Sequence, residues 1–355
     1  MVARSILSAA ALAGVALASP IQKRDAENMD GTILRLALTL EHFENVFYKT
    51  ALTNFTEDDF VQAGYSANYY NNLKYISYDE QEHVKFIESA LTAAGITPDA
   101  PCKYSFPYTD VVSFITLSSV LEGVGTSAYL GAAGLITDKN YLTAAGAILA
   151  VEAEHTSYQR AAVNKVPIAN PFGTPLDPTS SYSLAAGFIT ECPPGNRALG
   201  FTAFPALVVK DPPATAEEPS NKPSDAIKRS FAIANAIAIA TGGGSDKPDT
   251  PDHSDVPPVS CPGTTITVTC GPGHEDDTIP DGSYVTFVSG LAVVSVSGTV
   301  SGSEISAQIP SEASGQTYIF VTKSKITSIV DSEVIAGPAI VEVAPAAPAI
   351  DFDEA

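Results

Sequence analysis

The sequence predicts a mainly α-helical protein in which an antiparallel four-helix bundle is followed by a small β-sandwich. Residues 30–163 carry apolar side chains at the three- and four-residue spacing of amphipathic helices. From residue 261 onward the pattern changes to period two, as in "TTITVTC" and "SYVTFVSG", with glycine and proline between the runs. The hydrophobic fraction of 45% is enough to build a core in both parts.

Four helical segments account for the first part, at about 30–53, 66–94, 110–136 and 139–163. Thr56 in "TEDD" is a helix-start signal, Gly95 is a typical helix end, and Asp138 can cap the last segment. Because the joins are short, we expect neighbouring helices to be antiparallel.

The whole chain divides into seven parts by composition. We expect a signal peptide at 1–19, a short pro-segment at 20–24 and the bundle at 25–165, followed by a bundle-associated segment at 166–210. A low-complexity linker at 211–260, a β-rich domain at 261–345 and an acidic tail at 346–355 complete the chain.

The N-terminus and the charge predict a secreted protein. "MVARSILSAAALAGVALASP" has the form of a signal peptide, and Lys23-Arg24 resembles a dibasic processing site. The net charge of −21 disfavours nucleic acids and anionic membranes as partners. No later stretch approaches 18 apolar residues, and the C-terminus is acidic, so we expect no membrane anchor. The expected location is extracellular, with the cell wall as one option.

Two kinds of covalent modification are expected of a secreted protein. Four cysteines allow three pairings, of which Cys102–Cys192 together with Cys261–Cys270 is favoured over the other two. "NFT" at Asn54 is a glycosylation sequon at a helix boundary.

Two short motifs predict a metal site. "EQEH" at 80–83 and "EAEH" at 152–155 each place a glutamate and a histidine three residues apart, on one helix face. The first and third helical segments also carry a glutamate near the middle. The resulting set is Glu41, Glu80, His83, Glu122, Glu152 and His155.

Four buried carboxylates require compensating charge, which two divalent cations supply. A glutamate from two helices and Glu-x-x-His from the other two is the ligand set of di-iron and di-manganese bundles. We therefore expect two Fe or Mn ions as cofactors. The alternatives are a solvated charged face, or a bundle that keeps these residues without loading metal.

Neighbouring residues need separate assignment. Glu44 could share the face of Glu41, but Glu41 ranks first because Tyr48 follows it by one heptad, as Tyr129 follows Glu122. These tyrosines either hydrogen-bond the carboxylates or are plain core aromatics. We expect Glu82 and Glu154 to point to solvent, and also His42, which lies about 100° from Glu41 around the helix.

The same stretches resemble a known family. "LALTLEHFENVFYKTAL", "DEQEHVKFIESAL", "LEGVGTSAYLGAAG" and "AILAVEAEHTSYQR" look like the ferritin-like domain of secreted fungal stress-response and sexual-development proteins. The resemblance covers about 30–210 and reaches the tail through "GQTYIFVTKS", and it fits least at 211–260. It implies a ferritin-like bundle, a secreted protein linked to stress or development, and the same six metal ligands. It implies no particular activity.

Two functions of different class remain. One is a redox-active dinuclear metalloprotein that uses oxygen or peroxide in oxidase, peroxidase or catalase-like chemistry. The other is a non-enzymatic extracellular or wall-associated protein, with the bundle as scaffold and the β-rich domain available for cell-wall or self-association. Iron storage is a weaker reading, because the C-terminal extension would hinder packing into a shell.

Overall fold

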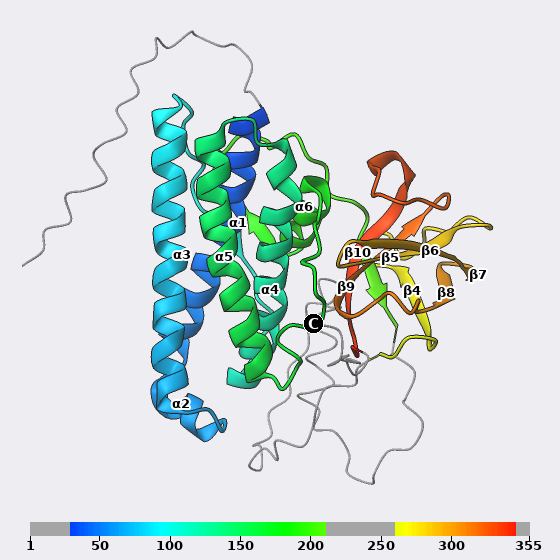
Figure 1. Ribbon diagram of the computed structural model, residues 1–355, viewed down its shortest axis with the longest axis horizontal. Helices are drawn as coiled ribbons and strands as arrows, with labels where there is room; N and C mark the ends of the chain where they lie inside the picture. Colours follow the sequence, from blue (N-terminus) through cyan, green and yellow to red (C-terminus); the bar gives the residue numbers. More distant parts are fainter. Residues whose placement is uncertain (1–28, 211–259, 346–355) are drawn as a thin grey trace, which may run out of the picture.

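The computed structural model describes residues 29–210 and 260–345 and has a helical bundle and a β-sandwich side by side (Figure 1). The predictions for 1–24, for 211–259 and for 346–355 lie outside the described residues. The expected fold class is confirmed, with helices in the N-terminal part and antiparallel sheets in the C-terminal part.

Four long helices form the bundle, namely α1 (Met29–Asn54), α3 (Ala67–Ala93), α4 (Val111–Ala132) and α5 (Lys139–Ala162). Side-chain caps set three of their starts, because Ser66, Asp110 and Asp138 each accept a bond from a backbone N–H in the first turn. Gly95 follows α3 with φ of 76°, a left-handed conformation typical of the residue after a helix. Short helices α2 (Glu57–Gln62), η1 (Ala133–Leu135) and α6 (Pro178–Ala186) lie at the ends and along one side.

The connection between α3 and α4 differs from the expected short join. The start of α4 packs in one cluster with the end of α1 and the start of α3, while Ala132 at its end packs with Ile33 near the start of α1. The segment 94–110 must therefore run the length of the bundle, and α3 and α4 point the same way. Its prolines keep it extended, and β1 (Lys103–Tyr104) within it pairs with β2 (Ile189–Glu191).

The disulfide predictions have different outcomes. Cys102 and Cys192 are bonded, which ties this crossover segment to the chain after α6. The expected Cys261–Cys270 bond is wrong, since no disulfide joins the two. Cys270 is the last residue of the extended strand β4 (Thr265–Cys270), and Cys261 comes before the start of this strand, which at about 3.3 Å per residue separates the two beyond the reach of an S–S bond.

Two four-stranded antiparallel sheets form the sandwich. One has the order β10-β9-β5-β6, from Val334–Val343, Gly315–Thr322, Tyr284–Ser289 and Ala292–Ser297. The other has the order β3-β4-β8-β7, in which β3 is Leu207–Val209, β7 is Thr299–Ser301 and β8 is Glu304–Gln308. A short helix, η2 (Asp331–Glu333), precedes β10.

The first of these sheets is buried on both faces. One face packs against the second sheet, while Tyr318, Phe320 and Ile340 on the other face pack against Val120 and Val124 of α4. Double burial explains why β9 and β10 are buried almost throughout, whereas in β4 buried residues alternate with more exposed ones. The sandwich is therefore docked on the bundle.

Polar contacts reinforce this interface. Arg160 near the end of α5 donates two hydrogen bonds to Glu342 of β10, at 3.0 and 2.7 Å, and both side chains are buried. The Tyr318 hydroxyl donates to the Gly123 carbonyl at 3.0 Å. Gly123 also leaves room for Gln316, whose amide would lie within 3 Å of any β-carbon there. A glycine at position 123 therefore allows β9 to pack closely against α4.

Helix α4 corrects the expectation that no stretch after the N-terminus approaches the length and hydrophobicity of a membrane span. Within the described ranges, Val111–Leu135 is long and apolar enough to cross a membrane by length and composition. Its most apolar window is 83% buried between the other elements, as expected of a core helix.

Candidate metal centre

The six residues selected from the sequence meet in the middle of the bundle. Each long helix contributes from its central turns, and the Glu-x-x-His spacing of α3 and α5 directs both members of each motif inward. All six side chains are buried, and Glu41, Glu80 and Glu152 are 0% exposed. We call this set the Glu/His cluster; it comprises Glu41, Glu80, His83, Glu122, Glu152 and His155.

The cluster divides into two overlapping groups of four. Glu41 and His83 belong to one group, Glu122 and His155 to the other, and Glu80 and Glu152 to both. Within each group one ligand atom per residue lies within 4.8 Å of the others. Two carboxylates shared between two positions are the arrangement that bridges a pair of ions.

The histidines face the carboxylates through Nδ1. His83 Nδ1 lies 3.3 Å from both Glu41 and Glu152 and 3.5 Å from Glu80. His155 Nδ1 lies 3.0 Å from Glu80 and 3.5 Å from Glu122. Both rings therefore direct the same nitrogen toward the acidic groups.

Unpaired polar atoms show that the cluster fits a metal. Among the described residues, both oxygens of Glu80 and Glu152, one oxygen each of Glu41 and Glu122, and both Nδ1 atoms are buried without a hydrogen-bond partner. Buried polar groups are normally paired, so these atoms indicate a missing common partner. Carboxylate oxygen with imidazole nitrogen is a donor set suited to iron or manganese.

Proton affinities in the cluster are strongly shifted. Burial raises the pKa of Glu41 to about 7, and burial with the charge of Glu80 raises that of Glu152 well above its usual value. Burial alone would raise the pKa of Glu80, but the nearby His155 and His83 side chains lower it to about 2. Burial opposes the charge on His155, yet the charge of Glu122 raises its pKa to about 12. Without metal, the cluster must hold protons to reduce its negative charge.

The two predicted tyrosines are hydrogen-bonded to the cluster, but each contacts the glutamate of the opposite helix. Tyr48 of α1 donates to Glu122 of α4, and Tyr129 of α4 donates to Glu41 of α1. Burial and the adjacent carboxylate raise the pKa of both phenols well above 10, so they stay protonated donors. Each tyrosine contacts one carboxylate oxygen of its glutamate, so the second oxygen is available to the candidate metal centre.

Glu44 was ranked below Glu41, and the structure places both at the site. Its side chain is 3% exposed, and its Oε2 has no hydrogen-bond partner among the described residues. Burial and the charges of Glu152 and Glu80 raise its pKa well above the usual value. The three-residue spacing from Glu41 was the available signal, and it indicated a shared face correctly.

Gly125 of α4 makes the space for this extra carboxylate. A β-carbon there would lie 2.7 Å from Glu44 Oε1 and 2.8 Å from Glu152 Oε2. Real β-carbons essentially never approach other atoms so closely. Glycine at this position therefore lets two carboxylates occupy the same side of α4.

Asp79 is a site residue that the sequence reasoning did not select. Its Oδ2 lies 3.3 Å from His155 Nε2, the ring nitrogen that faces away from the cluster. Such a carboxylate orients a metal-binding imidazole and increases its basicity. Helical periodicity did not select it, because it lies about 100° from Glu80 around the helix and its contact is with a histidine of another helix.

Three further assignments have clear outcomes. Glu82 is paired with Lys85 at 2.6 Å on the surface, and Glu154 is exposed, as expected. The expectation for His42 is wrong, since it is 4% exposed and its Nε2 lies 2.9 Å from the Asp99 carbonyl. The crossover segment 94–110 covers that side of α1, which helical periodicity alone does not reveal.

Comparison with known proteins agrees with this geometry. Residues 29–165 match the family model described as the ferritin-like domain, so this part of the chain is a ferritin-like domain. A similar relative is Protein rds1 of Schizosaccharomyces pombe, 29% identical over 191 residues, or 52% of this chain. The chain spans about half the length of this relative, since the match covers 46% of it. The predicted likeness to fungal ferritin-like proteins is thus confirmed.

Proposed function

We propose that the protein is a secreted dinuclear metalloprotein that binds two iron or manganese ions and reacts with dioxygen or peroxide. The observation that carries the proposal is the set of eight unpaired ligand atoms, supplied by six buried residues of four helices. Four carboxylates in one buried space repel one another, and two divalent ions would neutralise them.

The cluster residues have distinct roles in this proposal. Glu80 and Glu152 would bridge the ions, and Glu41 with His83 and Glu122 with His155 would complete the two positions. The bound ions would supply the oxidation–reduction chemistry. Tyr48 and Tyr129 hold the terminal glutamates in place by hydrogen bonds.

Asp79 provides a route for protons. Its carboxylate is 39% exposed and contacts His155 Nε2, so it connects a buried imidazole to solvent. Proton movement matters here because loading metal must displace the protons that the metal-free cluster holds.

The wider role follows from the resemblance noted above. We propose that the protein acts outside the cell or in the cell wall, in stress response or development, and that it does not act on nucleic acid. The N-terminal leader and the acidic charge support this. The bonded Cys102–Cys192 pair fits an oxidising compartment. Glycosylation at Asn54, an exposed residue at the end of α1, belongs to the same proposal.

The test is elemental analysis of the native secreted protein beside two double variants. Glu80→Ala/Glu152→Ala removes both bridging carboxylates and should abolish metal loading while the helices remain, as monitored by circular dichroism. The matched control Glu82→Ala/Glu154→Ala removes two outward glutamates from the same motifs and should leave about two ions per chain. A wild-type protein that holds no metal after purification without chelator and after reconstitution would favour the non-enzymatic scaffold instead.

A further inference from the structure

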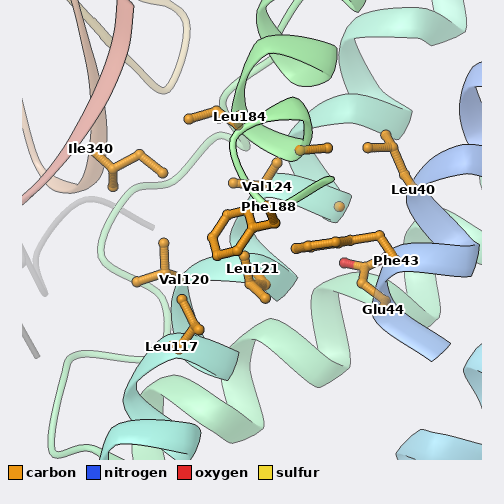
Figure 2. Close-up of a pocket in the computed structure, with 12 residues that line it drawn as sticks. Leu40, Phe43, Glu44, Leu117, Val120, Leu121, Val124, Leu184, Phe188 and Ile340 are labelled. Carbon is orange, nitrogen blue, oxygen red and sulfur yellow. The ribbon is translucent and has the colours of Figure 1, made fainter. Parts of the chain in front are cut away.

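An apolar cavity adjoins the Glu/His cluster on the side away from α3 and α5. Figure 2 shows it between Phe43 of α1, Val124 of α4, Leu184 of α6 and Ile340 of β10. Its volume is about 20 Å³, and every residue that lines it is buried. The walls of the cavity are therefore built from buried side chains.

One wall group is polar and links the cavity to the candidate metal centre. Glu44 lines the cavity, and its carboxyl group shares with Glu152 the space left open by Gly125. Since Glu152 belongs to both groups of the cluster, this single carboxyl group separates the cavity from the proposed ions. The remaining wall consists of aliphatic and aromatic side chains and Gly125.

Size and polarity together define the occupant. A cavity of this volume accommodates one molecule about as large as water. A buried water needs two to four polar partners, and this wall offers one carboxyl group. Hydrogen peroxide has the same requirement, whereas an apolar diatomic molecule has none.

We infer that this cavity holds dioxygen directly beside the metal centre. The use of this dioxygen as an oxidant at the metal centre rests on the proposed function. The binding of dioxygen rests on the cavity alone. A second cavity, of about 40 Å³, lies among α1, α3, α4 and α5. No carboxylate lines that cavity, and Phe86 in its wall is 45% exposed, so its wall is less buried than that of the first cavity.

This inference also gives the C-terminal part of the chain a function. Leu184, Phe188 and Ile340 cover a face of α1 and α4 that a bare four-helix bundle would leave open. Helix α6, the residue Phe188 that follows it and strand β10 of the sandwich thus cover the cavity next to the centre and shield the Glu44 side from bulk water.

Dioxygen itself is the probe for the test, because it is paramagnetic and speeds the relaxation of nearby nuclei. Metal-free full-length protein with labelled valine and leucine methyl groups would be compared under nitrogen and under oxygen pressure. We expect a several-fold larger relaxation enhancement at Val120 and Leu184 than at Val285 and Val321, which are fully buried in the sandwich core. Equal enhancement at the four positions would overturn the inference.

Two cavity-filling variants localise the effect. Ala185→Leu fills this cavity and should remove the enhancement at Val120 and Leu184, while the control Ala145→Leu fills only the second cavity and should leave it. If Ala185→Leu does not fold, Val124→Ile fills the space with a single methylene group. An enhancement that survives filling would count against the assignment.

The metal-loaded protein separates this inference from the proposed function. Ala185→Leu should slow the reaction with dioxygen several-fold at unchanged metal content, and Ala145→Leu should not. A protein that never loads metal would refute the proposed function and leave the relaxation result standing. A loaded protein that reacts at the same rate in both variants would refute the cavity as the source of oxidant.

Discussion

Gly125→Ala should separate metal binding from stability. The new β-carbon would stand 2.7 Å from Glu44 Oε1 and 2.8 Å from Glu152 Oε2, whereas ordinary contact begins at 3.4 Å. The Glu152 oxygen must therefore retreat by 3.4 − 2.8 = 0.6 Å. Metal–ligand distances tolerate about 0.2 Å, so under the proposed function Glu152 would lose its place as a ligand. We expect the metal affinity to fall by about 10–100-fold.

The same substitution should not weaken the metal-free bundle. Glycine inside a helix costs about 1 kcal/mol relative to alanine, and the displaced groups are the ends of flexible side chains. Gly146 in α5 is a matched control, because no atom lies within 4 Å of a β-carbon there. Gly146→Ala should raise the free energy of unfolding by about 1 kcal/mol and leave metal binding unchanged.

The assay combines anaerobic calorimetric titration with iron(II) or manganese(II) and urea unfolding of the metal-free proteins. Equal affinities in Gly125→Ala and Gly146→Ala would refute the role assigned to Gly125. A metal-free Gly125→Ala protein that fails to fold would show that the glycine serves packing rather than the centre.

Three further outcomes are expected. Glu342→Ala should lower the free energy of unfolding by about 3–5 kcal/mol in urea, because it leaves the buried charges of Arg160 and Lys165 without their carboxylate; a loss near zero would contradict this. Metal binding should release protons and strengthen as the pH rises through about 7, since burial raises the pKa of a cluster carboxyl group to that value; calorimetry in buffers of different ionisation enthalpy measures the release, and its absence would argue against protonated ligands. Replacing Cys102 and Cys192 by serine should cost about 2–5 kcal/mol, because the bond closes a loop with a sequence separation of 90; thermal unfolding tests it, and metal content should stay unchanged.

Local signals in the sequence were sufficient for the helices and for six of the site residues. Ser66, Asp110 and Asp138 cap helices because their side chains compete for backbone N–H groups a few residues away, so their effect is visible in one short stretch. The Glu-x-x-His motifs depend on the helix repeat alone.

The remaining features depend on contacts between distant segments. Glu44 reaches the site because Gly125, on another helix, leaves the space. His42 is buried because a crossover segment covers it, and its own helix gives no sign of this. The double burial of β9 and β10 likewise depends on the docking of the sandwich against α4. Periodicity within one element does not encode such partners.

The crossed tyrosine bonds indicate that the bundle is built from two equivalent helix pairs related by an approximate two-fold axis. Glu41 and Tyr48 of the first pair correspond to Glu122 and Tyr129 of the second, each by a shift of 122 − 41 = 129 − 48 = 81 residues. The two Glu-x-x-His motifs correspond by a shift of 152 − 80 = 72. A reciprocal exchange of hydrogen bonds across the axis is what such symmetry requires.

The symmetry fails at two places, and both lie at the centre. The shift of 81 pairs Glu44 with Gly125, so one half supplies an extra carboxylate and the other supplies the space that holds it. The shift of 72 pairs Asp79, which contacts His155, with Val151, which has no carboxylate to offer His83. If two ions bind as proposed, these two departures give them unlike positions, and we expect sequential occupation with two different affinities.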